Sequence, residues 1–375
     1  MTKDYTDLLP LLREALKQPS ELRAMLGFDG TVDVICRPVE SRQGSGNAFT
    51  PFATLGDFGQ RVVDADGKSA LIEIVKEREK IGGNGPIMAH ALSRSGVDID
   101  YIGPLGTPEL HPAYADFAER IKVHSVAEPA VTHALEFSNG KLMLSTISNY
   151  EGVTASSIEE VLEKNALIET VRHTRLCCFL NWTCLPELES IMAWFLADVL
   201  PLVGEERERI FFFDLADPSM RSDEDLRRVL WLIGKFSAFS KVVLGMNLNE
   251  AQQVARAFSI DEPISEAGSL SQALEAIRSK LGIYCAMAHP VDFAACATAE
   301  GQWAVAGPHT TKPRITTGAG DHLNAGFCLG LMLGFQPLHA LQLGVLFSGF
   351  YVRTATSPRL QDIPEFIDQL RTNPE

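Results

Sequence analysis

Several familiar signatures are missing from this chain of 375 residues, and each absence narrows the range of functions. None of the seven cysteines forms a Cys-x-x-Cys pair, so neither a zinc site nor a disulfide framework is supported. The Walker A pattern does not occur, and the Gly-x-Gly pairs at 83–85 and 318–320 lack the third glycine of a dinucleotide fingerprint. A P-loop NTPase and a nicotinamide-dependent oxidoreductase are therefore both weakened.

Basic residues are also scarce. The 33 lysines and arginines face 48 acidic residues, and the net charge of −15 disfavours a general electrostatic attraction to nucleic acid. The first residues lack the basic segment and apolar run of a signal peptide. Scattered, unpaired cysteines are typical of a reducing compartment. We therefore expect a cytoplasmic protein with no nucleic-acid partner.

Charge is absent altogether between residues 322 and 352, which a hydropathy window would read as a membrane span. The segment 334–337, Gly-Phe-Gln-Pro, interrupts this run, and each half is too short to cross a bilayer alone. The pattern predicts two consecutive buried helices and no membrane contact.

Short apolar runs alternate with helical patterns along most of the chain. Strands are expected over 24–28, 71–81, 99–102, 176–180, 210–213, 241–244 and 283–286. The segment 82–85, Gly-Gly-Asn-Gly, ends one strand, and Pro86 and Gly96 bracket a helix over 87–95. A strand–turn–helix–strand run of this kind predicts an α/β fold with a parallel sheet.

A β-hairpin is predicted inside this α/β pattern. Val131, Leu135 and Phe137 alternate with polar residues, and Asn139-Gly140 separates them from a second apolar run. The hairpin would serve as a lid or a small second sheet. Residues 40–60, rich in Ser, Gly, Asn and Gln, are expected to form the longest loop.

The most informative segment is 316–321, Thr-Thr-Gly-Ala-Gly-Asp, directly before the uncharged helix. A turn of small residues at a helix N-terminus presents unpaired N–H groups that bind anions, above all phosphate. A carboxylate beside such a site, here Asp321, can accept a proton from an attacking hydroxyl. The alternative is a tight turn in which Asp321 only caps the helix.

Two further segments strengthen the functional interpretation. The glycine pair in 82–85 lets a ligand approach the backbone, and Asp29 and Asp33 offer two carboxylates to hydroxyl groups after the first strand. In this order, the three segments resemble the ribokinase-like (PfkB) family of carbohydrate and nucleoside kinases. The resemblance extends from about residue 26 to the C-terminus.

The resemblance implies a doubly wound, mostly parallel sheet flanked by helices, with a small β lid. Residues 1–35, 82–130 and 150–375 would form the large kinase domain, and 36–81 and 131–149 the inserted lid. Dimerisation through the lid is implied by the resemblance alone.

The resemblance also assigns roles to residues. Asp321 would be the catalytic base, and the anion hole would be formed by the N–H groups of Gly318, Ala319 and Gly320. The acceptor would be bound by Asp33 and Asp29, with Gly83 and Asn84 lining the same pocket. Asn181 is added because it follows a buried strand, where ligands collect in open α/β sheets.

Thr316, Thr317 and Asn247 would contact the nucleotide. Asn247 and Glu250 match the family's Asn-x-x-Glu motif and would hold Mg²⁺ through water. The same two residues could instead form a helix N-cap.

Some positions depart from the family pattern. Ile315 replaces the usual Asp, which questions a monovalent-cation site, and Ile87 replaces an Asn that contacts the acceptor. The segment 288–293 replaces the glycine-rich nucleotide segment.

From the three motifs together, we predict a Mg²⁺-dependent kinase that transfers the terminal phosphoryl group of ATP to a sugar hydroxyl, with ADP open as the donor. The alternative is a sugar- or nucleotide-binding protein that has lost catalysis.

Overall fold

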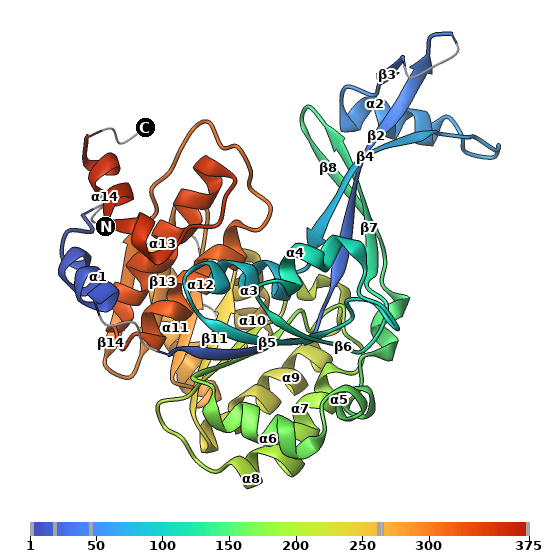
Figure 1. Ribbon diagram of the computed structural model, residues 1–375. Helices are drawn as coiled ribbons and strands as arrows, with labels where there is room; N and C mark the ends of the chain where they lie inside the picture. Colours follow the sequence, from blue (N-terminus) through green and yellow to red (C-terminus); the bar gives the residue numbers. More distant parts are fainter. Residues whose placement is uncertain (1–3, 18–20, 45–47, 261–263, 265, 373–375) are drawn as a thin grey trace.

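The computed structural model describes residues 4–17, 21–44, 48–260, 264 and 266–372. Two β-sheets organise these residues (Figure 1). A nine-stranded sheet carries helices on both faces and forms the body of the molecule, and a five-stranded sheet projects from it as an arm.

The large sheet has the strand order β14-β13-β12-β11-β10-β9-β1-β5-β6. Its strands are β1 (Arg23–Gly27), β5 (Asp98–Gly103), β6 (Lys122–Ser125), β9 (Leu176–Leu180), β10 (Ile210–Asp214), β11 (Lys241–Met246), β12 (Cys285–Ala288), β13 (Phe293–Thr298) and β14 (Gly301–Ala306). All neighbours from β6 to β12 are parallel, whereas β13 and β14 pair antiparallel. The chain builds outward from β1 on one side and then on the other, which confirms the doubly wound prediction.

Helices cover both faces because the strands are apolar on both sides. One hydrophobic cluster packs under α1 (Leu8–Lys17), α3 (Asn84–Arg94), α4 (Ala115–Ala118), α12 (Ala319–Met332), α13 (Pro337–Thr354) and α14 (Ile363–Thr372). The other packs under α5 (Ala155–Val161), α6 (Lys164–His173), α7 (Leu188–Trp194), α8 (Leu200–Val203), α9 (Asp223–Lys235), α10 (Leu248–Ala257) and α11 (Ala267–Leu281).

The uncharged segment 322–352 forms two buried helices, as predicted. α12 and α13 pack so closely that a Cβ on Gly330 would lie 2.7 Å from Cα of Ala340. Among the described residues, no helix is long and apolar enough to cross a membrane.

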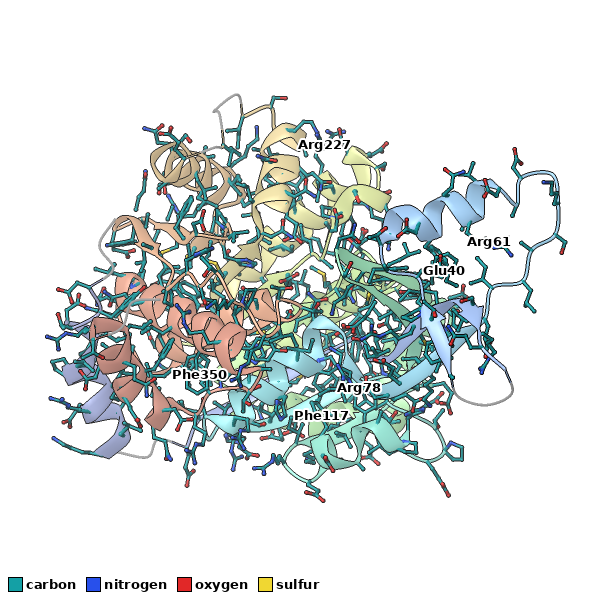
Figure 2. All side chains as sticks on the ribbon, turned by 90° about the horizontal axis from the view of Figure 1, so that it is seen from above. Glu40, Arg61, Arg78, Phe117, Arg227 and Phe350 are labelled. Carbon is teal, nitrogen blue, oxygen red and sulfur yellow. The ribbon has the colours of Figure 1, made fainter. Side chains whose placement is uncertain are left out.

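The arm is built on β2 (Thr31–Arg42), which pairs with β4 (Ile74–Gly82) on one side and β7 (Ala130–Phe137) on the other. β8 (Gly140–Thr146) pairs with β7, so the hairpin at Asn139-Gly140 is confirmed. β3 (Phe49–Pro51) pairs with the outer part of β2, and α2 (Leu55–Val63) covers this sheet through Phe58. Glu40 and Arg61, labelled in Figure 2, lie on the arm away from Arg227 and Phe350.

The prediction of a long loop over 40–60 is wrong for the described residues, which form parts of two strands and a helix. β2 continues to Arg42, β3 follows from Phe49, and α2 begins after Thr54, whose Oγ1 accepts a hydrogen bond from the Asp57 N–H. Polar composition outweighed this N-cap signal in the prediction. Residues 45–47 lie outside the described residues. The small sheet begins at Thr31, before the predicted domain boundary at residue 35. The predicted domain boundaries at 35 and 82 stay a prediction.

Candidate active site

Five neighbouring parallel strands each deliver a polar residue at the same edge of the large sheet. These residues are Asp29, Asn181, Asp214, Asn247 and His289, at or just after the ends of β1, β9, β10, β11 and β12. These residues lie at the C-terminal ends of the strands, and the group includes β1, where the strand order reverses. This point is the usual ligand site of open α/β sheets. The arm leaves the body at the same edge, because β2 follows β1 after three residues.

The small-residue turn before α12 presents unpaired amides at this edge. Gly318 is the N-cap residue and has left-handed backbone angles (φ 91°, ψ 0°), which favour glycine. In the part of the chain that the structure describes, the N–H groups of Gly318 and Gly320 have no protein acceptor. The N–H of Ala319, in contrast, donates to Thr316 O at 3.1 Å. The turn thus already uses the Ala319 amide, and the contribution of this amide to an anion hole stays a prediction.

Asp321 stands in the first turn of α12, beside these amides. Burial raises the pKa of its carboxyl group well above the usual value, and the nearby Asp214 and Asp29 raise it further. A hydrogen bond from the Asn84 side chain acts in the opposite direction. Asn84 belongs to the 82–85 segment, so the structure brings two of the three predicted motifs into direct contact.

Asp29 forms hydrogen bonds that hold the glycine-rich turn 82–85 in place. Its Oδ1 accepts the Gly85 N–H at 3.0 Å, its Oδ2 accepts the Asn181 side chain at 3.0 Å, and its side chain is 0 % exposed. A Cβ on Gly83 would lie 2.6 Å from Asp29 Oδ2, which explains the glycine there. Asp29 is therefore enclosed by protein groups in this structure, and its role as an acceptor-binding residue stays a prediction.

Asp33 lies at the base of the arm, against the same turn. The side chain is 8 % exposed, Oδ2 is 3.7 Å from Nζ of Lys80, and a Cβ on Gly82 would lie 2.4 Å from Oδ1. Burial raises the pKa of Asp33 and Lys80 lowers it. Asp33, Gly83 and Asn84 thus gather at one place, where β2 and the start of α3 meet.

Asn181 is buried behind them and has a left-handed backbone (φ 61°), which is uncommon outside glycine. Its Nδ2 binds Asp29, and its Oδ1 has no partner among the described residues. Its role as an acceptor-binding residue stays a prediction.

The Asn-x-x-Glu motif forms a complete capping box at the start of α10. Glu250 N–H donates to Asn247 Oδ1 at 2.9 Å, and Asn247 N–H donates to Glu250 Oε2 at 2.7 Å. The N-cap alternative is therefore realised. The capping box does not exclude a metal-binding role, because Glu250 is only 4 % exposed and lies near two more carboxyl groups, those of Asp214 and Asp217.

These carboxylates concentrate negative charge at the ends of β10 and β11. Burial, followed by Asp214 and Asp217, raises the pKa of Glu250 to about 8. Burial also raises the pKa of Asp214 to about 6. Among the described residues, no three His, Cys, Asp or Glu side chains are close enough to hold a metal ion by themselves. Hard oxygen donors in this number fit Mg²⁺ that is held through water and phosphate oxygens.

A cavity of about 340 Å³ opens beside the small-residue turn before α12. It is lined by His289, Pro290, Val291, Phe293, Gly307, Pro308, His309, Thr310, Pro313, Thr316, Ala319, Gly320, Leu323, Val345, Ser348, Gly349 and Val352. Burial lowers the pKa of His289 to about 4, so its ring is neutral at physiological pH. The lining is mostly apolar and suits the uncharged base of a nucleotide.

The two threonines predicted to bind nucleotide differ in their surroundings. Thr316 lines the cavity, whereas the carbonyl oxygen of Thr317 accepts a hydrogen bond from the Tyr351 hydroxyl at 3.2 Å. Sequence reasoning missed Tyr351 and the cavity position of His289, and it weighed Asp214 only as a residue after a buried strand that a loop cap would explain as well. The only available signal was that Asp214 and His289 lie at or just after strand ends, the rule that selected Asn181.

Comparison with known proteins agrees with this geometry. The sequence model of the prokaryotic ketohexokinase family matches residues 11–370. A ketohexokinase of Haloferax volcanii is 27% identical over 346 residues, which cover 92% of this chain and 90% of the relative.

Solved structures share the fold at low identity. The ribokinase of Arabidopsis thaliana, complexed with ribose and ATP, has a TM-score of 0.63 and 12% identity, covering 93% of this chain and 99% of the ribokinase. A putative sugar kinase from Clostridium perfringens also has a TM-score of 0.63, with 14% identity over 94% of this chain and 97% of its own. With the family match over almost the whole chain, these findings place the protein: it belongs to the prokaryotic ketohexokinase family and is a carbohydrate kinase with a ribokinase-like fold.

Proposed function

We propose that the protein transfers the terminal phosphoryl group of ATP to a hydroxyl group of a ketohexose, with Asp321 as the general base. One observation carries the proposal: Asp321 has a raised pKa and lies between two unpaired backbone amides and the side chain of Asn84. The family match and the name of the Haloferax relative support a ketohexose as the acceptor.

The site has two ends, which suit two substrates. The cavity beside Gly320 would receive the base of the nucleotide and direct its phosphates toward the start of α12. Asp33, Gly83 and Asn84 lie on the other side, below the arm, and would hold the sugar hydroxyl groups. Asp321 lies between the two ends, where the transferred phosphoryl group must pass.

The reaction would be a direct in-line displacement. The sugar oxygen forms a bond to the terminal phosphorus of ATP, the bond from that phosphorus to the bridging oxygen breaks, and ADP leaves. The proton of the sugar hydroxyl passes to Asp321, whose raised pKa makes it a stronger base than an ordinary carboxylate. The N–H groups of Gly318 and Gly320 face the negative charge that develops on the phosphoryl oxygens.

Glu250, with Asn247 at the same helix start, would hold Mg²⁺ through water, and the ion would neutralise charge on the phosphates. The protein's own contribution is the pair of buried carboxyl groups of Asp214 and Glu250, whose ionisation a divalent cation would favour.

The test is sugar-dependent release of ADP from ATP, with fructose as the ketohexose, glucose as the aldohexose, and the product identified by ³¹P NMR. We expect fructose phosphate from the wild type, a loss of at least about a thousandfold in kcat for Asp321→Asn, and retained nucleotide binding by that variant. Parallel assays with ADP as the donor decide the donor. Nucleotide and sugar binding without turnover would favour the binding-protein alternative. A homodimer formed through the arm stays a prediction, which sedimentation velocity tests.

A further inference from the structure

His322 follows Asp321 in α12 and is enclosed on every side. Its side chain is 1 % exposed, and its ring stacks on the ring of Tyr351 with centroids 3.6 Å apart and planes inclined by 13°. Nδ1 lies 2.7 Å from the carbonyl oxygen of Gly318, and Nε2 lies 2.8 Å from Oγ of Ser357. The proposed reaction uses none of these contacts directly.

The hydrogen bonds of His322 have a determined direction. A carbonyl oxygen only accepts, so the contact with Gly318 requires the proton on Nδ1. Burial lowers the pKa of His322 to about 4, so the ring is neutral and Nε2 must accept from the Ser357 hydroxyl. Oγ of Ser357 then accepts from Nδ1 of His90, 3.1 Å away. A directed chain of hydrogen bonds thus runs from α3 to the N-cap of α12.

This arrangement orients two consecutive peptide groups of the anion-binding turn. The Gly318 carbonyl oxygen accepts two hydrogen bonds, one from Nδ1–H of the His322 ring and one of 3.1 Å from the His322 backbone N–H. The preceding carbonyl oxygen, of Thr317, accepts a hydrogen bond from the Tyr351 hydroxyl. Because a peptide group is planar, holding the Thr317 oxygen also directs the Gly318 N–H. His322 acts on one plane directly and on the other through its stacking with Tyr351.

We propose that His322, held by the bond from its Nδ1–H to the Gly318 carbonyl, is a positioning residue that aims the Gly318 amide at the transferred phosphoryl group through its stacking on Tyr351. The inference rests on the proposed function, because it gives that amide its task. It adds a residue that touches neither substrate. Misdirecting one preorganised donor lowers kcat, because such donors act on charge that develops only in the transition state.

Three substitutions of His322 separate hydrogen bonding from packing. His322→Asn keeps a donor near the Nδ1 position, His322→Gln keeps a polar group near the Nε2 position only, and His322→Phe keeps the stacking alone. We expect His322→Asn and His322→Gln, which lose the stacking on Tyr351, to lose about 10- to 100-fold in kcat, with KM for ATP and fructose within about threefold. His322→Phe, which keeps the stacking, should keep kcat within about fivefold of the wild type. His173→Asn, on the exposed end of α6, is the matched control and should behave as the wild type.

A second measurement does not depend on turnover. ¹⁵N NMR of the imidazole groups should show His322 with a protonated Nδ1 and an unprotonated Nε2 from pH 6 to 8, and Ser357→Ala should keep this form, because the Gly318 carbonyl requires the proton on Nδ1. An Nε2–H form in the wild type would overturn the proposal. So would full kcat in His322→Asn and His322→Gln, or equal losses in all three variants that follow their melting temperatures. A wild type without sugar-dependent ADP release would refute the proposed function, and the NMR result would still judge the His322 tautomer.

Discussion

Asn181 donates a hydrogen bond of 3.0 Å from Nδ2 to Oδ2 of Asp29, across 152 positions of the sequence. The bond joins the ends of β1 and β9, where the strand order of the large sheet reverses. The other carboxylate oxygen of Asp29 accepts the Gly85 N–H, so one buried side chain ties the sheet edge to the start of α3. Asp29 therefore holds the start of α3 against the ends of β1 and β9.

Replacing Asp29 should reduce stability more than it changes the chemistry. Asp29→Ala leaves the Gly85 N–H and the Asn181 amide buried without an acceptor, and each such donor costs about 1–3 kcal/mol. We expect the free energy of unfolding to fall by about 3–5 kcal/mol in urea titrations. Asp66→Ala, at an exposed site on the arm, is the control and should change it by less than about 0.5 kcal/mol. Unchanged stability with a raised KM for the sugar would instead make Asp29 a sugar ligand.

The acidity of Asp321 should appear in the pH dependence of kcat. A general base works only when ionised, and burial with nearby carboxylates raises the pKa of Asp321. As pH falls through this raised pKa, kcat should decline at a higher pH than an ordinary carboxyl group would give. The Asn84 hydrogen bond lowers the pKa, so Asn84→Ala should move the acid limb to still higher pH. Asn165→Ala, exposed on α6, serves as the control, and an acid limb that stays in place in Asn84→Ala would contradict the assignment.

Gly320 and His289 should be coupled in nucleotide binding. A Cβ on Gly320 would lie 2.9 Å from Cε1 of His289, so alanine there must push the ring, which also lines the cavity. We expect Gly320→Ala to raise KM for ATP about tenfold, and the added change His289→Ala to recover most of that loss. Gly59→Ala on the arm, where a Cβ meets nothing within 4 Å, should leave KM unchanged. Simple addition of the two single effects would argue against the contact.

Much of the fold could be predicted because its signals are local. Strands buried on both faces appear as short apolar runs, and Asn139-Gly140 marks a hairpin wherever alternating runs flank it. α2 was missed for a physical reason. Its residues are amphipathic but none is buried, and the expectation for 40–60 followed the polar composition of the stretch instead of this pattern.

The site shows where local signals end. The motifs around Asn84 and Asp321 could be placed together because both precede helices after tight turns. Which of Asp29 and Asp33 faces the pocket depends on how β2 pairs with β4 and β7, and that register is a long-range property. The engaged N–H of Ala319 depends on the backbone angles of a single turn, which residue types alone do not define.

Glu250 should make the protein less stable as pH rises. Burial and nearby carboxylates raise its pKa in the folded state to about 8, well above that of an unfolded glutamate. Between about pH 4.5 and 8 the folded state therefore holds a proton that the unfolded state has lost, and rising pH favours unfolding. In thermal melts from pH 5 to 8.5, the melting temperature of the wild type should fall relative to that of Glu250→Gln, which has no proton to lose. The exposed Glu160→Gln on α5 should run parallel to the wild type.

At pH 8, Mg²⁺ with ATP should raise the melting temperature of the wild type more than that of Glu250→Gln, since the ion balances the carboxylate that the variant lacks. Parallel curves for the wild type and Glu250→Gln across this range would show that the buried carboxyl group ionises as freely in the folded protein as in the unfolded chain.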